Sequence, residues 1–163
     1  MKQLLIVRHA KSDWDEPNLT DFERALNKRG HKNAPEMAHR LHKKRFIPEQ
    51  LVTSPAKRAL TTAEYFAEEF GIKKSAIVKE SMIYEASSAT LLRVINNLEN
   101  KYDFIALFGH NPGITNLVTN LCDADIINIP TCGVALIEFP FDDWKMISEG
   151  TGKLELYDYP KKE

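Results

Sequence analysis

Residues 104–113 read FIALFGHNPG, and they decide the fold class. The apolar run from Phe104 to Phe108 has the length and composition of a strand that is buried on both faces of a sheet. After a polar turn that contains His110, apolar residues recur at helical spacing from Ile114 to Leu121. A buried strand that leads directly into a helix is typical of an α/β fold with a parallel sheet.

The same alternation of strand and helix continues on both sides of this stretch. Further strands are predicted at Leu4–Val7, Leu51–Thr53, Ile77–Val78 and Val134–Phe139. Further helices are predicted at Lys32–Lys43, from Ser54-Pro55 to Gly71, and after Ser87 or Ser88. A terminal hairpin is predicted from Lys145–Ile147 and Lys153–Tyr157. Together these elements predict a three-layer αβα sandwich around a mainly parallel sheet.

The composition is that of an ordinary globular protein, with 43% hydrophobic and 28% charged residues. We expect residues 1–163 to form a single domain. A net charge of −1 gives no reason to expect a nucleic acid or a membrane as a partner. The apolar run before Arg8 is too short for a signal peptide, so we expect a cytoplasmic protein in which Cys122 and Cys132 are reduced, structural thiols.

Polar clusters follow three of the predicted strands, at Arg8–Ser12, Ser54–Arg58 and Gly109–Gly113. Because the carboxyl ends of parallel strands share one edge of a sheet, we expect these clusters to meet in one crevice. Two arginines and two histidines would make that crevice a positive pocket suited to a phosphoryl group. The helix after Gly113 is expected to aim its free N–H groups at the same anion. Ser54 is expected to cap its own helix, with Pro55 as the first helical residue.

These clusters resemble the motifs of a known family. Arg8-His9-Ala10 resembles the Arg-His-Gly signature of the histidine phosphatase superfamily. The superfamily's second motif is similar to Ser54-Pro55-x-x-Arg58-Ala59-x-x-Thr62-Ala63, and its third motif is similar to Gly109–Gly113. The segment before its first helix resembles Arg24-Ala25-Leu26-Asn27-x-x-Gly30. The short chain and the start Arg-His-Ala-Lys-Ser look most like the SixA-type phosphohistidine phosphatase branch. The sequence departs from the signature at Ala10, a small change next to the nucleophile.

The resemblance implies a phosphoglycerate mutase-like fold and a metal-independent phosphatase without a cofactor. His9 would attack phosphorus and carry the phosphoryl group transiently on a ring nitrogen, while Arg8, Arg58 and His110 bind its oxygens. These residue types suit the chemistry, because a neutral imidazole is nucleophilic near pH 7 and arginine offers a fixed fork of donors. The substrate would be phosphohistidine on a protein.

Two further residues are weaker candidates. Many superfamily members carry an acid that protonates the leaving group, and Glu85 is the candidate here. Glu85 can equally be an acid that flanks a helix N-terminus. Ser12 is expected to contact phosphate or to pack within the long loop from Lys11 to Arg29, where Trp14 offers a substrate wall.

Other functions remain open on the sequence alone. A small-molecule phosphomonoesterase acting on a phosphorylated metabolite would use the same residues, and so would a non-catalytic, phosphate-binding regulatory module. A mutase would need a lid that excludes water, and no insertion supplies one. The basic stretch 28–45 can dock an acidic protein or form a solvated helix face, and its histidines lack the i, i+4 spacing of a helical metal site. The oligomeric state is not predicted.

Overall fold

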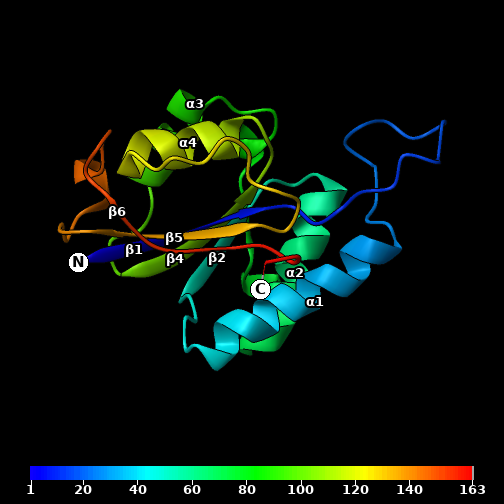
Figure 1. Cartoon of the computed structure of the whole chain (residues 1–163), viewed down its shortest axis with the longest axis horizontal. Helices are drawn as coiled ribbons and strands as arrows, with labels where there is room; N and C mark the ends of the chain where they lie inside the picture. Colours follow the sequence, from blue (N-terminus) through cyan, green and yellow to red (C-terminus); the bar gives the residue numbers. More distant parts are fainter. Residues whose placement is uncertain (163) are drawn as a thin grey trace.

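A six-stranded sheet lies at the centre of the computed structural model, which describes residues 1–162 (Figure 1). The strands are β1 (Lys2–Arg8), β2 (Gln50–Thr53), β3 (Val78–Lys79), β4 (Phe104–Gly109), β5 (Val134–Phe139) and β6 (Lys153–Asp158). The helices are α1 (Lys28–Lys43), α2 (Lys57–Phe70), α3 (Ser88–Asn96) and α4 (Gly113–Cys122). None of these helices is long and apolar enough to cross a membrane.

The helices cover both faces of the sheet and form two outer layers (Figure 1). Leu5 and Val7 of β1 pack in a core cluster with apolar residues of α1 and α2. Leu4 and Ile6 belong to a second cluster with apolar residues of α3 and α4. Successive side chains of a strand point to opposite faces, so one short apolar run supplies both cores. The predicted three-layer αβα sandwich is confirmed.

The strand order is β3-β2-β4-β1-β5-β6, and the pairs within β3-β2-β4-β1 are parallel. The two remaining strands are antiparallel to their neighbours. The predicted terminal hairpin is wrong, because β6 pairs with β5 instead. Residues Trp144–Met146 form a short 3₁₀ turn, in which the fully buried Trp144 packs into the core beside α3 and α4. Burying this indole fixes the segment against the helices rather than in the sheet.

The first turn of α2 also differs from the prediction. The helix begins at Lys57, and its N-cap residue Ala56 makes no side-chain capping bond. Ser54 lies in the turn before it, where its Oγ accepts a hydrogen bond from the backbone N–H of Ala56 at 3.2 Å. Ser54 is therefore free to face the edge of the sheet instead of the helix. The predicted helix end at Gly71 is confirmed, and this glycine adopts the left-handed conformation. Of the two serines predicted to cap the next helix, Ser87 and Ser88, Ser87 is the cap.

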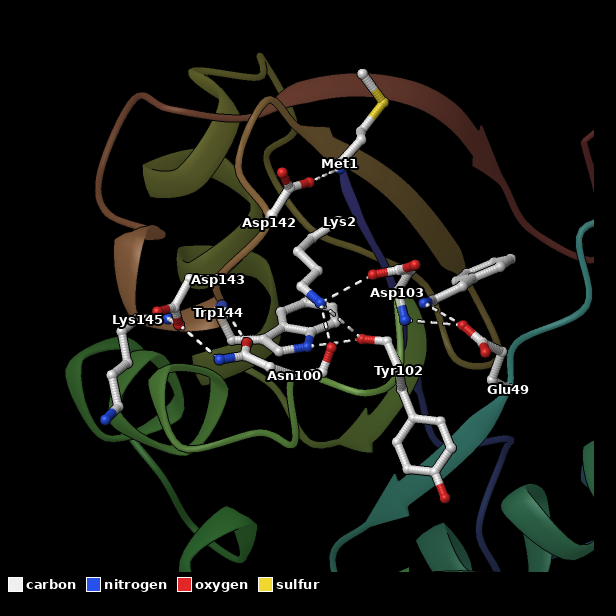
Figure 2. Close-up of polar contacts among 11 residues, drawn as sticks. Met1, Lys2, Glu49, Asn100, Tyr102, Asp103, Asp142, Asp143, Trp144 and Lys145 are labelled. Carbon is white, nitrogen blue, oxygen red and sulfur yellow. Dashed lines mark hydrogen bonds and ion pairs between the residues drawn. The ribbon is translucent and has the colours of Figure 1, made fainter.

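A buried lysine anchors the amino end of β1 (Figure 2), whereas the polar clusters follow the carboxyl ends of the strands. The side chain of Lys2 is 1% exposed, and its Nζ donates to the carbonyls of Asn100 and Tyr102 and to the carboxylate of Asp103 at 2.8, 3.1 and 2.9 Å. It also lies 5.4 Å from the ring centre of Trp144. A buried ammonium with three acceptors is satisfied, so it ties β1 to the loop before β4.

The register that results positions the polar clusters. Arg8 pairs with Gly109, so His9 and His110 leave neighbouring strands side by side. The long segment after His9 crosses this edge as a loop until α1 begins, and it is drawn in blue beyond the strand ends (Figure 1). A single bridge between Ser12 and Leu26 closes its base. Gly30 packs against that base so closely that a Cβ would lie 2.3 Å from the carbonyl oxygen of Lys11.

Candidate active site

All six predicted site residues line one cavity of about 450 Å³ at the carboxyl edge of the sheet. They are Arg8, His9, Ser12, Arg58, Glu85 and His110. The imidazole rings of His9 and His110 lie next to each other in the cavity lining, with their centres 5.2 Å apart and their planes tilted by 52°. Strand ends that share an edge bring these residues together although they are up to about a hundred positions apart in the sequence.

His9 is held as a neutral imidazole with a defined tautomer. Its Nδ1 lies 2.7 Å from the carbonyl oxygen of Ala10, and a carbonyl only accepts, so Nδ1 carries the hydrogen. Burial, with smaller contributions from His110, Arg58 and Arg8, lowers the pKa of His9 to about 3, against the opposing effect of the Ala10 carbonyl. Near pH 7 the Nε2 of His9 therefore has a free lone pair in the cavity.

A threonine supports the loop that carries this histidine. Thr62 Oγ1 accepts a hydrogen bond from the backbone N–H of Ala10 at 3.0 Å and donates one to the carbonyl of Arg58 at 2.8 Å. One buried hydroxyl thus fixes the distance between the residue after His9 and the helix that carries Arg58. The resemblance included Thr62 in its second motif, and this contact gives the residue a physical role.

His110 is oriented by Ser54, whose Oγ lies 2.8 Å from its Nε2. The Ser54 hydroxyl has no other acceptor among residues 1–162, so it donates to Nε2 and the ring hydrogen lies on Nδ1. Burial first, then Arg58, lowers the pKa of His110 to about 4, so the ring is neutral near pH 7. Its Nδ1 is buried and has no hydrogen-bond partner among the described residues.

The two arginines line the cavity, and each also keeps one unused donor. Arg8 donates from Nη1 to the carbonyl of Ile129 at 2.9 Å, and Arg58 donates from Nη1 and Nη2 to Asp21. The Nε of each remains buried without a partner. Within residues 1–162, only three buried side-chain nitrogen or oxygen atoms lack partners, and they belong to Arg8, Arg58 and His110. Buried donors are rarely left unpaired, so this cluster indicates a site for an anion that accepts from them.

The helix after the third motif uses two of its first N–H groups within the protein. Ile114 donates to the carbonyl of His110, and Thr115 donates to the Oδ1 of Asn111. These two groups are therefore not free for an anion, and the prediction that the helix aims its free N–H groups at one stays a prediction. Gly113 serves packing, since a Cβ there would lie 2.2 Å from the carbonyl oxygen of Ala86. The Asn111 side chain caps the helix, so the His110 ring is left to the cavity.

The sequence analysis did not single out Asp21, which lines the cavity, or Tyr84, whose ring centre lies 5.5 Å from that of His110. Asp21 Oδ2 accepts hydrogen bonds from Arg58 Nη2 at 3.0 Å and from Tyr84 Oη at 2.6 Å, and Oδ1 pairs with Arg24 at 2.8 Å. The Tyr84 hydroxyl, followed by Arg58, holds the pKa of Asp21 below its usual range. The same bond raises the pKa of Tyr84 to about 12. Asp21 lies in a loop without periodicity. The only signal in the sequence was its position three residues before Arg24, the first residue of the segment that resembles the one before the family's first helix.

The weaker candidates are placed at the rim. Glu85 is exposed and adopts a left-handed backbone conformation, with φ 55°, which turns the chain at the cavity mouth. Ser12 is buried and accepts a hydrogen bond from Arg24 Nε at 3.3 Å. Arg24 also stacks on Trp14, with its Cζ 3.4 Å from the ring centre, and Trp14 is 74% exposed. Trp14 and Arg24 therefore form a flat wall on one side of the cavity.

No group of three or more histidine, cysteine or acidic side chains within residues 1–162 is placed to hold a metal ion. In the basic stretch, His39 and His42 both contact the carboxylate of Glu69, at 3.4 and 2.6 Å. These contacts lie on the exposed faces of α1 and α2. Cys122 is half-buried and Cys132 is fully buried, and both are free thiols.

Comparison with known proteins agrees with the motifs. Residues 4–87 match the model of the histidine phosphatase superfamily, branch 1. An uncharacterised chloroplastic protein of Arabidopsis thaliana is 27% identical over 152 residues, which cover 88% of this chain and 69% of the relative. The match to the family model includes His9, Arg58 and Glu85, whereas His110 lies beyond it.

Solved structures share the fold over nearly the whole chain. The putative phosphohistidine phosphatase SixA from Agrobacterium tumefaciens superposes with a TM-score of 0.82, at 26% identity and with 98% of each chain covered. A protein histidine phosphatase SixA complexed with tungstate superposes with a TM-score of 0.77, at 22% identity and with 97% of each chain covered, and this likeness concerns the fold alone. The fold is that of the phosphoglycerate mutase-like proteins. The chain therefore belongs to branch 1 of the histidine phosphatase superfamily, and it is a phosphatase.

Proposed function

We propose that this phosphatase removes the phosphoryl group from phosphohistidine on a protein, with His9 as the nucleophile. The observation that carries the proposal is the pairing of a neutral His9 with three buried, unpartnered donors on Arg8, Arg58 and His110. A nucleophile with a free lone pair and a set of unfilled donors around the same cavity is suited to attack on a bound oxyanion.

The reaction would proceed in two displacements. In the first, His9 Nε2 forms a bond to phosphorus while the bond from phosphorus to the substrate nitrogen breaks, and the released imidazole takes up a proton. In the second, water attacks the phosphoryl group on His9 and releases inorganic phosphate. Arg8, Arg58 and His110 would neutralise the charge on the phosphoryl oxygens in both steps. The hydrogen bond from Nδ1 to Ala10 would keep the ring oriented throughout.

Glu85 would serve as the acid and then the base. Its side chain lines the cavity mouth, where a leaving group and an incoming water would pass. It is exposed, so solvent reaches its carboxylate freely. This suits a leaving group that needs little help, and a protonated imidazole is such a group. An alkyl phosphate would depend more on the acid.

The size of the site supports a phosphate carried on a protein. Between α2 and β4 the chain has only the two-residue β3, two short 3₁₀ turns and α3, so no large insertion covers the cavity. A small cavity with an open mouth admits a phosphorylated side chain that projects from a surface. Support also comes from the similar structure of the Agrobacterium tumefaciens protein SixA, which is described as a putative phosphohistidine phosphatase. A small phosphorylated metabolite is the second candidate, because a cavity of about 450 Å³ has room for one.

The test compares substrates under chelation. Purified protein is assayed in excess EDTA with an aryl phosphate, a histidine-phosphorylated protein and a sugar phosphate. His9→Ala should abolish turnover of all three, whereas His39→Ala, at an exposed position on α1, should leave it unchanged. We expect the highest kcat/KM for the phosphohistidine protein. A higher kcat/KM for the sugar phosphate would contradict the proposed substrate, and activity that EDTA abolishes would contradict the metal-independent mechanism.

A further inference from the structure

A second hollow, of about 590 Å³, lies beside the catalytic cavity. Its walls are the first turns of α1, the loop at Pro130-Thr131 and the C-terminal tail at 159–161. The basic residues that line it are Lys11, Lys28, Arg29, Lys32 and Lys161. We refer to this hollow as the basic groove. The tail runs beside α1 (Figure 1), where Arg40 donates to the carbonyls of Tyr159 and Pro160 at 3.0 and 2.8 Å.

The residues that line the basic groove carry more positive than negative charge. Lys11, Lys28 and Arg29 also border a neighbouring hollow that holds Asp13 and Asp15, and these two carboxylates offset part of that charge. Glu36 is the one acidic residue in its lining, and Arg40 already binds that carboxylate at 2.7 Å. None of the five basic residues forms an ion pair with another residue within 1–162. The protein as a whole carries a net charge of only −1. A local excess of positive charge on such a protein attracts an acidic ligand to this face.

The basic groove also differs from an ordinary solvated helix face. Lys28, Arg29 and Lys32 come from α1, but Lys11 comes from the loop after β1 and Lys161 from the other end of the chain. The histidines of the basic stretch do not line the groove: His31 contacts Tyr65, and His39 and His42 contact Glu69 on α2. The fold therefore gathers cations from three separate segments around one hollow.

The basic groove continues directly from the catalytic cavity, because Lys11 and Thr131 line both. A polypeptide with its phosphohistidine in the cavity would leave through the open mouth and pass over these two residues. An extended chain advances about 3.3 Å per residue, so a few residues next to the phosphohistidine would reach the groove.

We propose that the basic groove binds an acidic segment of the substrate protein, next to its phosphohistidine. The proposal rests on the proposed function and adds a requirement for the sequence around the phosphorylated histidine. Aspartate or glutamate side chains in that segment would pair with Lys28, Arg29 and Lys32. Such exposed pairs raise the rate of encounter and set the orientation of the substrate more than they tighten binding.

The test uses two synthetic peptides, each of which carries one phosphohistidine. In one peptide the residues on both sides are aspartate, and in the other they are asparagine. The groove variant combines Lys28→Glu with Lys32→Glu. The control variant combines Lys73→Glu with Lys74→Glu, which make the same change in net charge at exposed positions after α2. Glutamate near the start of a helix is favourable, so the groove variant is expected to fold. Turnover of an aryl phosphate, which does not reach the groove, reports folding and basal activity.

For the wild type we expect kcat/KM for the aspartate peptide to exceed that for the asparagine peptide about tenfold at low salt. The preference should disappear in the groove variant and in about 0.5 M sodium chloride, and it should persist in the control. Equal turnover of the two peptides would overturn the proposal, and so would an equal loss in both double variants. Inhibition by inorganic tripolyphosphate that the groove variant relieves, without a peptide preference, would assign the groove to small polyanions instead. If the aryl phosphate is hydrolysed but neither peptide is, the proposed function itself fails.

Discussion

The carboxylate of Asp21 lies 3.0 Å from Nη2 of Arg58, within the cavity that would receive the phosphoryl group. The backbone carbonyl of Asp21 binds the same guanidinium through Nη1, at 2.6 Å. The loop after β1 thus holds Arg58 twice, once with a neutral group and once with a charge. The carbonyl orients the arginine in any state, whereas the carboxylate also opposes the approach of an oxyanion.

Replacing Asp21 with asparagine should therefore strengthen oxyanion binding. The pair is partly exposed, so the effect is modest, and we expect the inhibition constant of tungstate against an aryl phosphate to fall about threefold. The control is Asp125→Asn, which makes the same charge change at an exposed position outside the cavity. Asp21→Asn should also lower the pKa of Tyr84 from about 12 toward its usual 10.0, and a titration of the tyrosinate absorbance measures this change. Weaker tungstate inhibition would mean that Asp21 serves mainly to position Arg58.

The two cavity histidines should make stability depend on pH. Their pKa values are about 3 and 4 in the folded protein and 6.5 when unperturbed, so the unfolded chain binds protons that the folded protein does not. The stabilising contribution is complete above pH 6.5 and is lost as the pH falls toward these folded values. Each histidine should lower the free energy of unfolding by about 1 kcal/mol per pH unit over that range.

Urea unfolding at several pH values measures this dependence. His9→Gln and His110→Gln should each flatten the slope between pH 6.5 and pH 4. An unchanged slope in His9→Gln would show that His9 is protonated in the folded protein. A protonated His9 would have no free lone pair, so this outcome would also count against its role as nucleophile.

Glu85→Gln should discriminate between leaving groups. If Glu85 donates a proton, kcat/KM for an alkyl phosphate should fall about a hundredfold, while an aryl phosphate and a phosphohistidine peptide should lose much less. The comparison of the three substrates is the measurement, since a structural defect would lower all three alike. Equal losses, or none, would assign Glu85 to the turn before α3 rather than to proton transfer.

Thr62→Val should loosen the link between His9 and Arg58. The substitution keeps the shape of the side chain but leaves the buried N–H of Ala10 without its acceptor. We expect a loss of about 1–3 kcal/mol in the free energy of unfolding and a fall in kcat that exceeds any change in KM. Thr119→Val, which removes a hydroxyl bond to Asn116 on the exposed side of α4, is the control. Unchanged kcat with lowered stability would limit Thr62 to a structural role.

The apolar runs predicted the sheet and its layers because they depend on burial alone. Phe104 to Phe108 and Leu4 to Val7 are buried on both faces, and this pattern needs no partner to be recognised. The prediction of a terminal hairpin was wrong because Trp144 is buried against Lys2 and α3. These contacts join distant parts of the chain, so no local sequence pattern contains them. Tertiary packing overrides local preference at such a position.

The residues of the candidate site could likewise be predicted only in part from the sequence. His9, Arg58 and His110 follow buried strands, so the shared edge of a parallel sheet was enough to bring them together. A serine just before a helix usually caps that helix, and this preference leads to the prediction for Ser54. In the folded protein its hydroxyl contacts His110, which comes from another motif. Asp21 and Tyr84 meet only through the folded loop, so their pairing required the structure.

The nucleophile is tested most directly by trapping the phosphoryl enzyme. The wild type is mixed with an aryl phosphate, quenched in base within one turnover, and mapped by peptide mass spectrometry. We expect one phosphoryl group on His9, stable in base and lost in acid as expected of a phosphoramidate, and none in His9→Ala. A phosphoryl group on any other residue, or full turnover by His9→Ala, would contradict the assignment of His9 as the nucleophile.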